Sequence, residues 1–206
     1  MSSRTRAPFR REPKQRRSQQ TVEAVLDAVV RILKREGRGA VTTNRIADVA
    51  GVSIGSLYQY FPDKSAIFVA LHERHVREVD RRLQSTLIEH SSSALDVLVR
   101  ALIQTMVDVH RPDPELFELL STRVPHRPQG SKAFGVRLHA VIRLAIASRE
   151  RELDAGRDLD KVVFVVTNMI DALSHAAVLQ RPPGLTLDAA VGETTNAVLA
   201  YLRSRT

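Results

Sequence analysis

The 206-residue chain contains no cysteine and no tryptophan, and only 4% of its residues are aromatic. Without cysteine the chain can form no disulfide, and it can offer neither a thiolate nucleophile nor a thiolate metal ligand. Alanine, valine and leucine dominate the apolar 43% of the sequence instead. A composition of this kind, with few aromatic residues, suits a helical core.

Long uninterrupted apolar runs are also missing. The longest such stretch, 162–179, is interrupted by Asn168, Asp171, Ser174 and His175. Polar and charged side chains near the centre of a bilayer are costly, so we expect a buried helix here and no membrane partner. The basic N-terminus lacks the apolar segment of a secretory signal, which predicts a cytoplasmic protein.

Signatures of catalysis are scarce. There is no glycine-rich phosphate-binding loop and no GxSxG motif. His72 and His75 lie one helical turn apart around Glu73, but the HExxH spacing of zinc proteases is absent, so these two histidines make an incomplete metal site. We therefore expect no enzymatic activity, no metal and no cofactor.

Positive charge is concentrated in the first third of the chain. Residues 1–64 carry thirteen Lys and Arg against six Asp and Glu, whereas residues 65–206 carry eighteen against seventeen. Seven of the basic residues lie in 1–17, a proline-containing segment without apolar periodicity that we interpret as a flexible basic arm. A basic third joined to a neutral remainder indicates a polyanion-binding module attached to a second domain.

Apolar residues recur at helical spacing along the rest of the chain, and no segment alternates with a period of two. The first helix is expected from about Ser18 to the glycines at 37 and 39, and an Asp63 cap is expected to start a long helix that ends near His90. The breaks at proline and glycine delimit the other helices. They are expected at 43–50, 54–60, 94–110, 113–124, 130–152, 158–180 and 187–203. The predicted class is all-α, with about nine helices.

Two short predicted helices joined by a tight turn describe a helix-turn-helix. Ala47 precedes Gly51 by four residues, at a point where the helices approach closely, and Gly51 lies where a positive φ is commonly needed. Ile46, Val52 and Leu57 supply the apolar contacts between the two helices. The combination of five such residues at this spacing predicts the motif.

The second short helix is polar on one side. Small Gly55 would let its backbone approach DNA, and Lys64 is placed to neutralise a phosphate. Hydroxyl and amide groups of this kind contact phosphates and base edges in a major groove. They belong to Ser53, Ser56, Tyr58, Gln59 and Tyr60.

The stretch TTNRIADVAGVSIGSLYQYFPDKSAI, residues 42–67, resembles the N-terminal domain of the tetracycline-repressor (TetR) family. It contains the pattern Thr-x-x-x-Ile-Ala, then Ala-Gly-Val-Ser, then a small residue and Leu-Tyr-x-Tyr-Phe. The resemblance implies that Thr43, Ser53, Ser56, Tyr58, Tyr60 and Lys64 contact DNA. Asn44 and Ile54 occupy DNA-facing positions too, but they replace a frequent arginine and a frequent polar residue. The operator sequence therefore cannot be inferred.

The resemblance also implies two domains with different functions. Residues 18–64 would form an N-terminal three-helix helix-turn-helix DNA-binding domain, and 65–206 a helical ligand-binding and dimerisation domain. The two C-terminal helices would form the homodimer interface, which agrees with the nearly all-round apolar character of 158–180. An unknown small molecule would bind among the central helices. The candidate effector-binding residues are Met106, His110, Phe117, Leu120, Phe134, Leu138, His139, Ile142, Phe164 and Asn168.

The expected function is a ligand-responsive repressor that binds a palindromic double-stranded DNA operator as a homodimer and is released by its effector. Two alternatives stay open at this point. The chain could be a DNA-binding protein that responds to no ligand, or a transcriptional activator.

Overall fold

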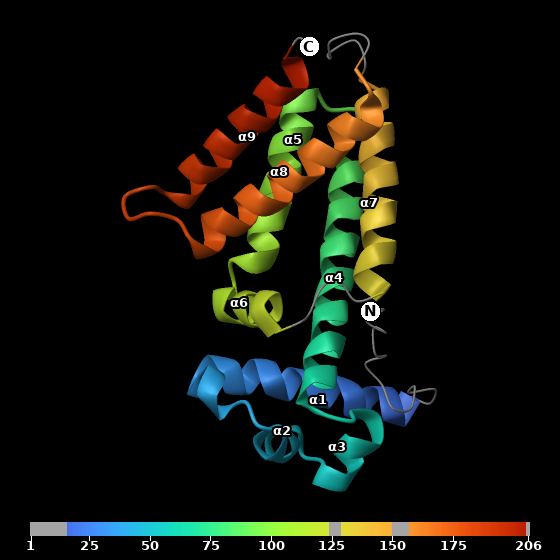
Figure 1. Ribbon diagram of the computed structural model, residues 1–206, viewed down its shortest axis with the longest axis vertical. Coiled ribbons are helices and arrows are strands. Elements are labelled where there is room, and N and C mark those ends of the chain that lie inside the picture. Colours follow the sequence, from blue (N-terminus) through green and yellow to red (C-terminus); the bar gives the residue numbers. More distant parts are fainter. Residues whose placement is uncertain (1–15, 124–128, 150–156, 205–206) are drawn as a thin grey trace, which may run out of the picture. The chain divides into compact units, whose positions relative to one another are not determined.

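The computed structural model describes residues 16–123, 129–149 and 157–204, except the side chains of 123 and 129–134. The described residues form nine α-helices and one short 3-10 helix, η1 (Arg38–Ala40), and no strand occurs among them, which confirms the all-α prediction (Figure 1). The α-helices are α1 (Arg16–Glu36), α2 (Thr43–Ala50), α3 (Ile54–Tyr60), α4 (Lys64–Glu89), α5 (Leu95–His110), α6 (Pro114–Arg123), α7 (Gln129–Ala147), α8 (Leu159–Leu179) and α9 (Leu187–Arg203).

The helices begin where short polar side chains can cap them. Thr42 accepts a hydrogen bond from the backbone N–H of Arg45, and Asp63 accepts one from Ala66. Asp158 and Thr186 cap α8 and α9 in the same way. These caps satisfy backbone donors that a helix start leaves without intrahelical partners. They explain why the predicted starts of α2, α4, α8 and α9 lie within one residue of the observed ones.

The described chain divides into two compact units. The first contains the described residues up to Val76 together with those of Glu115–Ser131, and the second contains those of Arg77–Pro114 and of Lys132–Thr206. The boundary between Val76 and Arg77 falls inside α4, so this helix contributes residues to both units.

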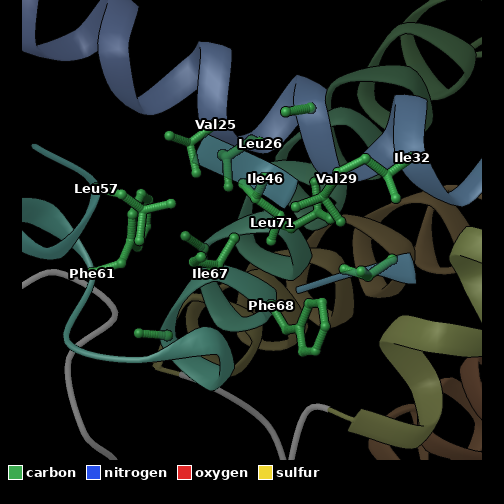
Figure 2. Packing of buried hydrophobic residues seen from close by; sticks show 14 of the residues in the cluster. Val25, Leu26, Val29, Ile32, Ile46, Leu57, Phe61, Ile67, Phe68 and Leu71 are labelled. Carbon is green, nitrogen blue, oxygen red and sulfur yellow. The ribbon is translucent and has the colours of Figure 1, made fainter. Parts of the chain in front are cut away.

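The core of the first unit holds the short helices α2 and α3 against α1 and the first turns of α4. Val25, Leu26 and Val29 project from α1 toward Ile46 of α2 (Figure 2). Leu57 of α3 lies in the same cluster and is fully buried. Burying an aliphatic side chain of this size contributes about 1.5–3 kcal/mol, so the two short helices, which would not be stable alone, are held by this core.

The core of the second unit joins α4, α5, α7, α8 and α9 in one cluster. Ile103, Val163 and Val198 are fully buried there. Helix α8 is long and apolar enough to span a membrane by length and composition alone, but one such helix is weak evidence for a span because core helices pass the same test. Its apolar positions at Val162, Val163, Val166 and Ile170 instead belong to this core.

Candidate nucleic-acid interface

A left-handed glycine makes the turn between α2 and α3. Gly51 has φ 69° and ψ 32°, and its N–H donates to the carbonyl of Asp48 at 3.1 Å. The N–H of Val52 donates to the carbonyl of Ala47 at 3.0 Å. This backbone conformation costs an L-residue roughly 1–2 kcal/mol, whereas glycine adopts it freely. The predicted positive φ at Gly51 is confirmed.

The apolar residues of the motif lie between the two helices as predicted. Ile46 and Leu57 are fully buried and Ala47 is 4% exposed. Val52 is partly buried and packs against the same cluster. The orientation of α3 is therefore fixed by its one buried side, which leaves the opposite side of the helix available for recognition.

The opposite side of α3 is exposed. Ile54 and Tyr58 are 39% and 40% exposed although both are largely apolar, and Gly55 and Gln59 are exposed too. Tyr60 differs, because it is partly buried and packs against the core of the first unit. Its ring supports α3, and only its remaining exposed part can reach a partner.

Hydroxyl groups join the start of α3 to the start of α2. Ser53 accepts a hydrogen bond from the N–H of Ser56 at 3.0 Å, and the two hydroxyls lie 2.8 Å apart. The Tyr58 hydroxyl donates to Thr43 Oγ1 at 3.4 Å. Asn44, the next residue of α2, is exposed. The polar residues predicted to contact DNA therefore lie along α3, from its cap Ser53 to Tyr60, and at the start of α2.

Lys64 lies in the first turn of α4. Its ammonium group donates to the carbonyl of Val41 at 3.2 Å and lies 5.9 Å from the centre of the Phe68 ring. Val41 precedes Thr42, the cap of α2, so Lys64 ties the start of α4 to the start of α2. The side chain stays exposed, and its positive charge is held at the helix-turn-helix.

Arg45 is a cation of the motif to which sequence reasoning gave no role. Its guanidinium pairs with Glu36 at 2.8 Å and also with Asp48. The hydrogen bond from Arg45 lowers the pKa of the Glu36 carboxyl. Arg31 of α1 also donates to the carbonyl of Val49 at 3.1 Å. These two arginines fix α2 against the end of α1, and no local sequence pattern distinguishes such ion-paired arginines from DNA-binding ones.

The candidate effector residues separate into two groups. Phe117 and Leu120 are buried in the first unit. Met106, His110, Leu138 and Ile142 are buried or partly buried in the second unit, where His139 pairs with Asp160 at 3.8 Å and Asn168 donates to the carbonyl of Phe164 at 2.7 Å. Phe164 is 64% exposed. The side chain of Phe134 lies outside the described residues. The predicted 1–17 arm also lies outside them, except for Arg16 and Arg17, which belong to α1.

Two family profiles cover most of the chain. Residues 25–71 match the profile described as "Bacterial regulatory proteins, tetR family". Residues 94–202 match the profile described as "Tetracyclin repressor-like, C-terminal domain". The first match contains the whole helix-turn-helix, and the second covers more than half of the chain by itself.

Individual proteins are similar over part of the sequence or over the fold. The nucleoid occlusion factor SlmA of Haemophilus ducreyi is 35% identical over 100 residues, which are 48% of this chain and 48% of that protein. The chain thus matches about half the length of this curated relative.

Two solved structures share the fold. A TetR-family regulator of Streptomyces coelicolor superimposes with a TM-score of 0.63 at 21% identity, over 88% of this chain and 97% of that one. The regulator FadR of Bacillus subtilis, solved with stearoyl-CoA, does so with a TM-score of 0.63 at 16% identity, over 89% and 99%. Together with the helix-turn-helix geometry, the two profile matches establish that the chain belongs to the TetR family of DNA-binding transcriptional regulators.

Proposed function

We propose that the chain is a repressor that binds a palindromic operator as a homodimer and leaves it when a small molecule binds. The observation that carries the DNA-binding part is the exposed polar side of α3 opposite fully buried Leu57. A helix presented in this way can enter a major groove, where hydroxyl and amide groups reach phosphates and base edges. The proposed DNA-contacting residues are Thr43, Asn44, Ser53, Ile54, Gly55, Ser56, Tyr58, Gln59, Tyr60 and Lys64.

The exposed side of α8 supports dimerisation through the two C-terminal helices. The sequence predicted that this apolar helix must be covered all round. Within one protomer, however, Phe164 remains 64% exposed, and Leu173, on the opposite side of the helix, is 38% exposed. Large apolar side chains left open on one helix are typical of protein–protein interfaces. A second copy of the chain is the proposed cover, with α9 alongside α8.

A dimer also accounts for the short length of the recognition helix, α3. One recognition helix of seven residues contacts few base pairs. Two such helices on half-sites about 34 Å apart, one turn of B-DNA, bind together and multiply specificity.

Release by an effector requires a ligand that prefers one of two conformations. We propose that residues 65–206 bind this ligand and that α4 transmits the change, because α4 belongs to both compact units. FadR of Bacillus subtilis carries stearoyl-CoA, whose acyl chain is apolar, in a similar fold, which supports an effector with a long apolar part. The protein would act in the cytoplasm, by binding and not by catalysis, with the 18–64 segment as its DNA-binding domain.

The relatives named nucleoid occlusion factor favour a second candidate function. Their similarity spans about half of this chain, and the second candidate is a DNA-binding protein that responds to no ligand. The two candidates differ in one respect that can be measured, namely whether any small molecule dissociates the protein from its DNA site.

The test is a selection of duplexes from a random DNA pool by the purified full chain, followed by sequencing of the retained DNA. Enrichment of a palindrome with half-sites about one helical turn apart is the expected result. Enrichment of isolated half-sites would contradict the dimer, and retention without any sequence preference would contradict the operator. The selected duplex then serves for a screen of small molecules that release the protein.

A further inference from the structure

Ile54 is an aliphatic residue that the core of the first unit does not cover. It is 39% exposed, whereas Leu57, three residues later on α3, is fully buried. Among the first-unit residues whose side chains the structure describes, Ile54 is the only valine, leucine, isoleucine, methionine or phenylalanine that is exposed. A single exposed aliphatic residue is not unusual in itself. What makes this one informative is its position on the proposed DNA-contacting surface.

Ile54 is the first residue of α3, and Gly55 is the second. The first residues of a recognition helix are those that contact base edges in the major groove. Gly55 has no side chain to contribute. Tyr58 lies one turn after Ile54 on the same side of the helix, and its hydroxyl donates to Thr43 Oγ1 at 3.4 Å. In the first turn, the contact with base edges therefore depends on Ile54 and on the two serines that flank it.

The two serines are partly engaged with each other. Ser53 accepts a hydrogen bond from the backbone N–H of Ser56 at 3.0 Å, which makes it the cap of α3. The two hydroxyl oxygens lie 2.8 Å apart, so one hydroxyl donates to the other. A serine has a single hydroxyl proton, and the pair therefore keeps only one proton between them for a base or a phosphate. Ile54 is the one side chain of this turn that is wholly available.

The side chains that usually read a G·C pair are missing from α3 or engaged beside it. Arginine and lysine read guanine, and aspartate and glutamate accept from cytosine. Helix α3 carries no charged side chain. Arg45 of α2 pairs with Glu36 at 2.8 Å and with Asp48. Lys64 donates to the carbonyl of Val41 at 3.2 Å. The base pair that faces the first turn of α3 is therefore read without charge.

An aliphatic side chain can distinguish one base from the other three. Thymine alone carries a methyl group in the major groove, and apolar residues pack against it. Covering the methyl group and the exposed part of Ile54 together removes apolar surface from water. Any other base would place a hydrogen-bonding group against the isoleucine, where it loses water and gains no partner. Both effects favour thymine at this position.

We infer that Ile54 reads the methyl group of a thymine, so that each operator half-site carries an A·T pair facing the first turn of α3. This inference rests on the proposed function, because it names one base pair of the proposed operator. It makes Ile54 a residue that determines sequence specificity, whereas Lys64 contributes affinity for any sequence.

The test uses the selected operator duplex and versions of it in which each thymine of one half-site is replaced in turn by deoxyuridine. This replacement removes only the methyl group. Wild-type protein should bind one of these duplexes about threefold to fivefold more weakly, the usual worth of one buried methyl group. Ile54→Ala should bind that duplex and the parent duplex alike, and Ile54→Val should keep part of the preference. Fluorescence anisotropy titrations measure all of these affinities.

Val97→Ala is the matched control variant, because Val97 is also an exposed aliphatic residue, 47% exposed, but lies on α5. It should keep the full wild-type preference for thymine over uracil. A matched pair of duplexes controls for DNA shape: the A·T pair is replaced by a G·C pair that carries either cytosine or 5-methylcytosine. Wild-type protein should prefer the methylated duplex, and Ile54→Ala should not. Melting curves should show that Ile54→Ala is folded, since the residue it replaces lies outside the core.

Two outcomes overturn the inference and leave the regulator intact. Wild-type protein could bind every uracil-substituted duplex as tightly as the parent duplex, which would mean that no methyl group is read in the half-site. Alternatively, Ile54→Ala and Ile54→Val could both keep the full preference at the same position, which would assign the methyl contact to another side chain. Retention of DNA without any sequence preference in the initial selection is a different result, since it contradicts the proposed operator itself and the inference with it.

Discussion

Ser53 Oγ lies 3.9 Å from the position that a Cβ atom on Gly55 would occupy, and among the described residues no other atom beyond the chain neighbours and the nearby helix backbone comes within 4 Å of that position. Gly55 lies in the first turn of α3 and has no positive φ. Neither packing nor backbone conformation within the protein therefore requires glycine here. Nothing in the fold explains the glycine at this position, and it lies on the exposed side of α3, the proposed DNA-contacting surface.

Gly55→Ala is accordingly expected to stabilise the protein and weaken operator binding at the same time. Alanine replaces glycine within a helix with a gain of about 0.5–1 kcal/mol. The added methyl group would prevent the closest approach of the α3 backbone to DNA. Chemical denaturation measures the first effect, and a titration of the selected duplex measures the second.

Gly192→Ala is the matched control for this change. Gly192 lies within α9, and a Cβ there would meet only an Arg100 nitrogen, also at 3.9 Å. This variant should gain similar stability and bind the operator like wild type. Unchanged operator affinity in Gly55→Ala would remove Gly55 from the proposed contact set.

The helix-turn-helix could be predicted from the sequence because its determinants are local. Thr42 and Ser53 cap their helices by accepting hydrogen bonds from backbone N–H groups three residues later in the chain. The turn depends on the left-handed conformation of one residue, Gly51. Such effects depend on a few consecutive side chains. For the same reason, the predicted helices 43–50 and 54–60 agree with the observed bounds of α2 and α3.

Lys64 is predicted to contribute to DNA binding through charge alone. Lys64→Met keeps the apolar stem over the Phe68 ring but removes the ammonium group that donates to Val41. If the ammonium group neutralises one phosphate, operator affinity should fall for every sequence alike, and the slope of log affinity against log salt should decrease by about 0.9. The measurement is a series of operator titrations at several salt concentrations.

Lys161→Met serves as the control, because Lys161 is an exposed lysine at the start of α8 that pairs with Asp158 at 3.3 Å. It should leave the salt slope unchanged. A wild-type slope in Lys64→Met, together with a lower melting temperature, would show that Lys64 only ties α4 to the start of α2.

The interior of the second unit could be predicted only in part. Periodicity located Met106, His110 and Ile142 on core-facing sides, but the same reasoning grouped them with Phe117 and Leu120, which lie in the first unit. The order of helices along the chain does not reveal which unit each one joins. Ser174 was recognised only as an interruption of an apolar stretch, whereas its complete burial is a three-dimensional property.

Phe164→Glu is predicted to dissociate the dimer without unfolding the protomer. Phe164 is 64% exposed in one protomer, so a charge there is hydrated until a second copy covers it. Burying that charge at an interface without a partner would cost several kcal/mol, roughly 3–5 by analogy with broken buried ion pairs. Sedimentation measures the oligomeric state, and circular dichroism checks the helical content.

Val136→Glu is the comparison, because Val136 is 72% exposed and equally apolar but lies on α7. It should remain dimeric if the two C-terminal helices form the interface. Dissociation by Val136→Glu with an intact Phe164→Glu dimer would instead place the interface on α7.

Arg149 is predicted to stabilise the second unit more than any exposed ion pair. Arg149 comes two residues after the end of α7 and is only 8% exposed. Its guanidinium donates to the carbonyls of His90, Ser91 and Ser93 at 2.8–3.1 Å. These carbonyls lie between the end of α4 and the start of α5, and that of His90 also accepts a hydrogen bond from the N–H of Ser93. Arg149→Met would keep much of the apolar contact and remove the guanidinium donor from these part-buried carbonyls. We expect the free energy of unfolding to fall by about 3 kcal/mol, since hydrogen bonds to charged groups are worth about 1.5–3 kcal/mol each and part of the loss is recovered by water.

Arg143→Met makes the comparison specific, because Arg143 lies on α7, close to Arg149 in the chain, and pairs with Asp160 at 2.7 Å on the surface. Exposed pairs of this kind contribute less than about 1 kcal/mol, so urea denaturation should distinguish the two variants clearly. Equal midpoints for both variants would mean that the backbone around residues 90–93 finds other partners, and that the connection between α4 and α5 does not depend on Arg149.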